Sequence, residues 1–121
     1  VPKVRTSTAA SRSTLPDSVP HADAAATAGR AALLGAATVA GDPELFAAAL
    51  WDRLHEPYRA SPELAAIRGD LPPGCAGATL SGSGPTVIAW ASDAGPCVAA
   101  LRERFPEHDV LELPVSPRGA L

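Results

Sequence analysis

A chain of 121 residues with a formal net charge of −3 has the length of one domain with a modest core. Its ten cationic side chains, nine of them arginine, are scattered rather than gathered in a basic stripe, which argues against a nucleic-acid-binding protein. No apolar run approaches the ~20 residues of a membrane span, and the first twenty residues lack the apolar centre of a signal peptide, so we expect a cytoplasmic protein without a membrane partner.

The first forty residues predict a short strand and two helices. Residues 1–5 form an extended segment, and Thr6 or Ser7 can cap the brief helix that follows. Residues 23–40 are rich in Ala and Leu and contain no Pro, so we expect a long and largely buried helix there. Gly41 is a natural stop for it.

Two further helices have strong start signals. Asp42–Glu44 supplies a cap, a proline at the first helical position and an acid in the first turn. An apolar residue at every fourth position then extends this helix to about His55. Ser61–Glu63 repeats the signal for a shorter helix that ends near Arg68.

The second half of the chain predicts a hairpin, a helix and a strand. Two apolar runs, Ala76–Thr79 and Val87–Trp90, flank a glycine-rich loop. Asp93 can cap a last helix through Phe105, and residues 111–115 alternate as an edge strand does. The resulting order predicts an α+β fold, a ferredoxin-like two-layer sandwich whose antiparallel sheet has its helices on one face.

The loop between the two apolar runs carries the strongest functional signal. It consists of Ser81, Gly82, Ser83, Gly84, Pro85 and Thr86. Its glycines let another group approach the main chain, its three hydroxyls lie close together, and its proline stiffens the exit. Gly, Ser and Pro are also the usual residues of turns. The loop alone therefore fits an anion- or substrate-facing role and a plain turn equally well.

Two arginines stand out. Arg30 lies in the middle of a predicted helix, and no residue three or four positions away is an acid. It reaches water, pairs with a distant carboxylate or binds an anionic ligand. Arg59 follows Pro57 and Tyr58 at a predicted helix end. A guanidinium on such a stiff corner suits bidentate recognition of a carboxylate or phosphate, and it is also compatible with a simple surface arginine.

The histidines and cysteines show no catalytic or metal-binding pattern. Cys75 and Cys97 lack metal-ligand spacing and do not make a disulfide framework, and His21 and His108 have no partner set around them. No Ser/His/Asp or Cys/His arrangement is evident. We therefore expect no metal site and assign no catalytic residue.

Taken together, these residues resemble a known family. Leu80–Thr86 followed by Val87–Trp90 looks like the third signature motif of the GHMP small-molecule kinases. The rest resembles the C-terminal half of the homoserine kinase branch, in order and roughly in spacing. The segments that carry this second resemblance are Ser7–Pro16, Asp23, Arg30–Leu34 and Asp52–Arg59. The resemblance covers nearly all of the chain and implies that residues 1–121 are a GHMP kinase C-terminal domain, with the N-terminal ATP-binding domain absent.

The resemblance also implies an activity. Homoserine kinases transfer the γ-phosphoryl group of ATP to the side-chain hydroxyl of L-homoserine, giving O-phosphohomoserine for threonine biosynthesis. In this chain Arg30 and Arg59 would hold the α-carboxylate, Thr27 would lie near the substrate, and Ser81–Thr86 would shape the active site. Such phosphoryl transfer depends mainly on alignment and charge neutralisation, much of the latter from Mg²⁺.

One family motif is missing. The loop of the form Pro-x-x-x-Gly-Leu-Gly-Ser-Ser-Ala, which binds ATP phosphates at a helix N-terminus, has no match here. We therefore expect ATP and Mg²⁺ to serve the whole enzyme, and the isolated chain to bind no cofactor and to be inactive. A surface that faces the missing domain would favour self-association, including a homodimer.

Two other functions stay open. The chain could be a non-catalytic module that binds a carboxylate metabolite or a partner chain through Arg30 and Arg59. It could also be a fragment of a GHMP kinase that acts on another substrate, such as mevalonate or a sugar, although Pro57–Arg59 argues for the homoserine branch.

Overall fold

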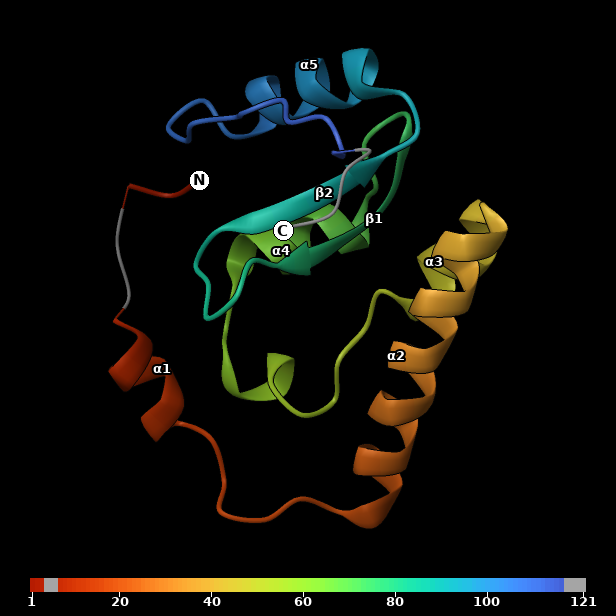
Figure 1. Ribbon diagram of the computed structural model, residues 1–121. Helices are drawn as coiled ribbons and strands as arrows, with labels where there is room; N and C mark the ends of the chain where they lie inside the picture. The colour runs from red at the N-terminus through yellow and green to blue at the C-terminus, as the bar shows by residue number, and fades with distance from the viewer. Residues whose placement is uncertain (4–6, 117–121) are drawn as a thin grey trace.

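The computed structural model describes residues 1–3 and 7–116 and shows an α+β fold within them (Figure 1). Its elements in chain order are α1 (Thr8–Ser13), α2 (His21–Ala40), α3 (Pro43–Ala49), the 3-10 helix η1 (Glu56–Tyr58), α4 (Pro62–Gly69), β1 (Cys75–Leu80), β2 (Val87–Ala91) and α5 (Ala94–Arg104). None of the helices in this part of the chain combines the length and the apolar character that crossing a bilayer requires.

An antiparallel hairpin and two helices form the core. In the β1–β2 ladder Ala78 faces Ala89 and Leu80 faces Val87, so these four side chains lie on one side of the hairpin. Helices α4 and α5 pack against that side. The buried members of the resulting cluster are Leu64, Ile67, Ala78, Cys97 and Leu101. This arrangement confirms the expected α+β class, with α4 and α5 on one face.

On the opposite face of the hairpin, α3 and the residue after it contact Trp90 and Gly77. The Phe46 ring lies edge-on to Trp90, with centroids 5.4 Å apart. A methyl group added at Gly77 would come within 2.7 Å of a Leu50 methyl, so glycine is needed for Leu50 to approach β1. These contacts place α3, and α2 beside it, next to the sheet.

The two expected outer strands are not formed in the described residues. Residues 1–3 have no strand and residues 4–6 lie outside the description, so the first expectation is tested only in part. Residues 111–115 are irregular, and Leu111, Leu113 and Val115 are 65%, 79% and 82% exposed. The alternating pattern of residues 111–115 gives the segment an apolar side, but it does not provide a neighbouring strand to pair with. Pro114 also has no N–H to donate to a ladder.

Three of the predicted helix caps are confirmed, and a fourth is not. The Ser7 side chain accepts a hydrogen bond from the Ala10 amide, that of Asp42 from Glu44 and Leu45, and that of Ser61 from Leu64. Helix α2 ends at Gly41, whose φ of 66° lies in the left-handed region as expected. Asp93 precedes α5, but its side chain makes no capping hydrogen bond.

Two helix expectations are wrong. Helix α3 ends at Ala49 instead of continuing to His55. Its last carbonyl oxygens find side-chain donors from elsewhere: Arg30 Nη1 lies 2.7 Å from Ala48 O, and Arg68 Nη2 lies 2.8 Å from Leu50 O. A continuing helix would have needed those two carbonyls for its own amides.

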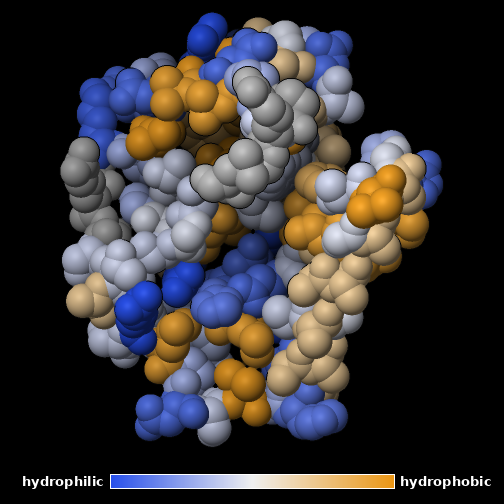
Figure 2. All heavy atoms as spheres, in the orientation of Figure 1, coloured by the Kyte–Doolittle hydropathy of each residue, from blue (hydrophilic) through white to orange (hydrophobic). Residues whose placement is uncertain are grey.

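Helix α2 is not largely buried. Ala37 is its one buried residue, and Val39 is 91% exposed. Figure 2 shows the outer side of this helix as a mostly apolar surface at the right of the molecule. An Ala- and Leu-rich composition makes burial favourable, but within the described part of the chain α3 lies beside α2 and most residues of α2 stay exposed.

Candidate functional site

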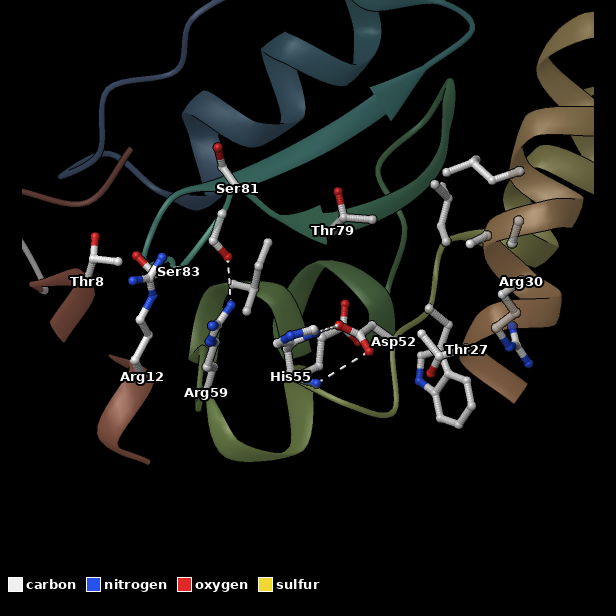
Figure 3. Close-up of a pocket in the computed structure, with 18 residues that line it drawn as sticks. Thr8, Arg12, Thr27, Arg30, Asp52, His55, Arg59, Thr79, Ser81 and Ser83 are labelled. Carbon is white, nitrogen blue, oxygen red and sulfur yellow. Dashed lines mark hydrogen bonds and ion pairs between the residues drawn. The ribbon is translucent and has the colours of Figure 1, made fainter. Parts of the chain in front are cut away.

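A cleft of about 860 Å³ lies between α2, the segment that follows α3, the loop between the strands, and α1 (Figure 3). Of the residues predicted from sequence, it brings together Thr27, Arg30, Arg59, Ser81, Gly82 and Ser83. Gly84, Pro85 and Thr86 do not line it. Thr86 borders a second cavity of about 370 Å³ beside β2. In Figure 2 hydrophilic residues gather at the centre of the view, between α2 and the rest of the chain.

The glycine loop is a tight turn held by its own backbone. The Ser81 amide donates to Thr86 O at 2.8 Å, and the Gly84 amide donates to Ser81 O at 3.0 Å. Gly82 and Gly84 have φ values of 57° and 75°, which side-chain-bearing residues rarely adopt. A Cβ at Gly82 would meet no atom within 4 Å, so the backbone angle rather than lack of space requires glycine there.

Arg59 leaves a stiff corner and reaches the glycine loop. The corner is η1, and the Tyr58 carbonyl within it accepts a hydrogen bond from Thr14 Oγ1 at 3.2 Å. Arg59 Nη1 donates to Gly82 O at 3.0 Å. Its Nε is buried and has no hydrogen-bond partner among the described residues. Arg59 is therefore oriented but has donors to spare.

Arg30 lies at the other side of the cleft, against an aromatic ring. Its guanidinium carbon is 4.6 Å from the centroid of Trp51, and Arg53 lies 4.7 Å from the same ring. Arg53 also pairs with Asp23 at 3.2 Å, and its amide donates to Thr27 Oγ1 at 3.4 Å. In Figure 3 Arg30 and Arg59 project from opposite walls of the cleft. The structure thus brings both arginines to one cleft without bringing them into contact.

The two acids that line the cleft already have partners. Asp52 accepts hydrogen bonds from the Leu54 amide and from the His55 ring. Glu56 makes a two-pronged ion pair with Arg68, at 2.7 and 2.9 Å. Neither side-chain carboxylate pairs with any of the three arginines that line the cleft.

Three guanidiniums of the cleft consequently lack a carboxylate partner within residues 1–3 and 7–116: Arg12, Arg30 and Arg59. Guanidinium groups recognise carboxylates and phosphates through parallel N–H···O bonds. A concave surface with this excess of positive charge attracts small anions. Anion binding is therefore the chemistry that the cleft supports best.

Sequence reasoning missed Arg12, Trp51 and the Glu56–Arg68 pair. The test that singled out Arg30, the absence of an acid three or four positions away, would also have identified Arg12 and Arg68. Nothing local indicated Trp51, because its two arginine neighbours come from different elements. The pairing of Arg68 with an acid twelve residues earlier likewise has no helical spacing.

The residues present do not form a magnesium–nucleotide site by themselves. Among the described residues no group of three His, Cys, Asp or Glu side chains is placed to hold a metal ion. The acids Asp52 and Glu56 are engaged as described above, and the amides of Ser81 and Gly84 are used within the loop.

Two titratable groups with clearly shifted pKa values lie outside the cleft. A hydrogen bond from its own backbone amide, and then His108, lower the pKa of Glu63 below 4.5. Burial, and then the neighbouring Cys75, raise the pKa of the Cys97 thiol to about 11. Both residues border the second cavity. Cys97 is therefore a buried core thiol that stays protonated near neutral pH.

Comparisons with known proteins agree on one family. Residues 34–107 match the family model described as "GHMP kinases C terminal". The chain is 49% identical over 96 residues to a homoserine kinase of Streptomyces avermitilis, covering 78% of this chain and 31% of that protein. A homoserine kinase of Rhodococcus erythropolis is 42% identical over 118 residues, covering 96% and 37%.

A solved structure shows the same fold. The crystal structure of a homoserine kinase from Cytophaga hutchinsonii superposes with a TM-score of 0.76 at 27% identity, covering 87% of this chain and 35% of that one. The chain thus spans about a third of the length of the relatives that it matches. With a family model matched over more than half of its residues, this chain belongs to the GHMP kinase C-terminal family.

Proposed function

We propose that residues 1–121 are the C-terminal domain of a homoserine kinase and carry the substrate side of its active site. The whole enzyme would use ATP and Mg²⁺ to phosphorylate the side-chain hydroxyl of L-homoserine, in the cytoplasm, as a step of threonine biosynthesis. This chain matches the C-terminal model of the GHMP kinases, and it also matches about a third of the length of relatives named homoserine kinase. The remaining two thirds of such a protein would include the nucleotide-binding domain.

The observation that carries this proposal is the cleft in which every acid is paired and three arginines are not. The α-carboxylate of an amino acid is a suitable partner for Arg30 and Arg59. Each of them uses one guanidinium nitrogen on a backbone carbonyl, which leaves several N–H donors for a ligand. Thr27 accepts the Arg53 amide through its oxygen, so its own hydroxyl hydrogen is free to reach the substrate.

The structure of the free cleft implies a movement on binding. Arg30 and Arg59 project from opposite walls, and Arg30 lies over the Trp51 ring while donating to Ala48 O. To contact the same carboxylate as Arg59, Arg30 would exchange that carbonyl for the ligand. Holding the amino acid in this way would orient its hydroxyl for attack on the phosphoryl group. Such positioning is a main contribution of the protein to phosphoryl transfer.

Isothermal titration calorimetry with L-homoserine tests the binding part of the proposal. We expect saturable binding by this chain and its loss in Arg59→Ala. Arg102→Ala is the matched control, because Arg102 lies exposed on α5, away from the cleft. Absence of binding, or equal binding by wild type and Arg59→Ala, would contradict the assignment.

An ADP-release assay with ATP, Mg²⁺ and L-homoserine tests the missing half. We expect no turnover by this chain alone, because its cleft does not form a magnesium–nucleotide site. Turnover by the isolated chain would contradict the division of the active site between two domains.

A further inference from the structure

A third arginine of the cleft takes no part in the proposed carboxylate site. Arg12 lies on α1, lines the cleft, and makes no hydrogen bond or ion pair with the other described residues. Figure 3 shows it rising from α1 toward Ser83, on the side of Arg59 that is remote from Arg30. In the neighbouring loop the Gly82 and Ser83 carbonyls accept from Arg59 and Ser11, and neither of them is a partner of Arg12.

The placement of Arg12 is fixed by the residue before it. Ser11 is 6% exposed, and its hydroxyl donates to Ser83 O at 3.4 Å. Thr14, two residues after Arg12, donates to the Tyr58 carbonyl. Helix α1 is therefore attached both to the glycine loop and to the corner that carries Arg59, and Arg12 is held between these two points.

At the glycine-loop end of the cleft, the positive charge of Arg12 and Arg59 is greater than the single negative charge of one carboxylate. Arg12 and Arg59 flank the same loop, and the buried Nε of Arg59 lacks a partner in the part of the chain that the structure describes. A phosphate monoester carries about −1.5 to −2 charges at neutral pH and three acceptor oxygens. Two guanidiniums supply two positive charges and several N–H donors, which match the charge and the acceptor oxygens of such a group.

We propose that Arg12, together with Arg59, forms a phosphate-monoester subsite at the glycine-loop end of the cleft. The inference rests on the proposed function, in which Arg30 and Thr27 hold the amino-acid end of the same ligand. Arg59 lies between the two ends and serves both. A phosphorylated hydroxy-amino acid, the product class of the reaction, would then span the cleft with its phosphate at Arg12 and its carboxylate toward Arg30.

The test compares three ligands and three variants of this chain. Binding of inorganic phosphate, O-phospho-L-homoserine and L-homoserine is measured by calorimetry in low-salt buffer, with Arg12→Gln, Arg30→Gln and Arg59→Gln. Because a hydrogen-bonded charge pair is lost, we expect Arg12→Gln to weaken the two phosphate ligands about tenfold. The same variant should bind L-homoserine as the wild type does.

The other variants complete the pattern. Arg30→Gln should weaken L-homoserine and leave inorganic phosphate unchanged, whereas Arg59→Gln should weaken all three ligands. Arg12→Lys, which keeps the charge, should retain most of the phosphate affinity. Arg102→Gln is the control for non-specific charge effects, and circular dichroism checks that each variant is folded.

The outcomes separate this inference from the proposed function. Unchanged phosphate affinity in Arg12→Gln, an equal loss in Arg102→Gln, or no phosphate binding at all would overturn the subsite. If L-homoserine fails to bind while phosphate binds and depends on Arg12, the homoserine assignment fails and the subsite stands. Phosphate affinity that depends on Arg12 and falls as salt is raised supports the proposal, since exposed charges are screened by salt.

Discussion

The hairpin with α4 and α5 and the pair α2–α3 are stabilised in different ways. The first region, which we call the core half, shares one buried apolar cluster. The second, the helical arm, has Ala37 and Ala49 as its buried residues and exposes most of α2. Besides the Phe46–Trp90 contact, polar contacts such as Arg30 with Ala48 O and Arg53 with Asp23 hold it in place.

This difference matters for function, because the arm carries one wall of the cleft. Thr27 and Arg30 belong to α2, whereas the glycine loop belongs to the core half. The wall proposed to bind the amino acid therefore rests on the less buried region. Ligand affinity should respond to changes in the arm, while overall stability should respond mainly to changes in the core half.

The largest expected effect is in the core half. Ile67 is 4% exposed, and Ile67→Ala should lower the free energy of unfolding by about 2–4 kcal/mol through lost burial and a residual cavity. Val39→Ala, at a position 91% exposed on α2, should change it by no more than about 0.5 kcal/mol. Urea denaturation measures both. Similar losses in the two variants would break the comparison.

The second effect concerns the joint between the two regions. Arg68 on α4 binds Glu56, Ala78 O and Leu50 O, and its side chain is 27% exposed. Arg68→Met leaves a largely buried carboxylate and two carbonyls without a donor, so we expect a loss of about 1.5–3 kcal/mol.

A double-mutant cycle with Glu56→Gln separates the pairwise part of that loss. Lys3→Met is the control, because the Lys3–Glu107 pair is exposed and should contribute less than about 0.5 kcal/mol. If Arg68→Met lowers the free energy of unfolding as little as this control does, the contacts of Arg68 do not hold the two regions together.

A third, smaller effect tests whether the arm orients Arg30. Trp51→Ala removes the ring on which Arg30 and Arg53 lie, and should lower stability by about 1 kcal/mol. The affinity for L-homoserine should fall as well, whereas Trp51→Phe should preserve most of it. Denaturation and calorimetry give the two quantities. An affinity unaffected by Trp51→Ala would show that Arg30 does not depend on the ring.

The smallest effect is a pH dependence in the core half. The pKa of Glu63 is lowered in the folded chain, first by its own backbone amide and then by His108. Its contribution to stability is therefore present above the unfolded pKa, near 4.5, and lost as pH falls through the lower folded value. The difference between wild type and Glu63→Gln, below about 1 kcal/mol, should shrink toward zero in acid. A difference that grows on acidification would contradict this assignment.

Helix starts could be predicted from sequence because their causes are local. Ser7, Asp42 and Ser61 each cap amides within three residues, and Gly41 ends α2 through its own backbone angle. The hairpin was also predictable, since two apolar runs flank a short glycine-rich turn. The end of α3 was not, because Arg30 and Arg68 take its carbonyls from 18 residues away in each direction.

Part of the lining of the cleft was predictable from sequence, but the geometry of the cleft was not. Thr27, Arg30, Arg59 and the first half of the glycine loop do line one cleft. Sequence could not show that Arg30 lies on Trp51, or that Glu56 is occupied by Arg68, because these contacts join distant elements. The alternation of residues 111–115 likewise could not reveal that no neighbouring strand pairs with them in the described structure.

Helix α2 contains two glycines whose Cβ positions are open: a methyl group at Gly29 or Gly35 would meet no atom within 4 Å. Glycine inside a helix costs about 0.8–1.0 kcal/mol relative to alanine, and within the described residues no close packing offsets that cost. The substitutions Gly29→Ala and Gly35→Ala should therefore raise the free energy of unfolding while leaving the shape of the surface almost unchanged. A chain that carries them would be a convenient background in which to compare ligand affinities of the arginine variants.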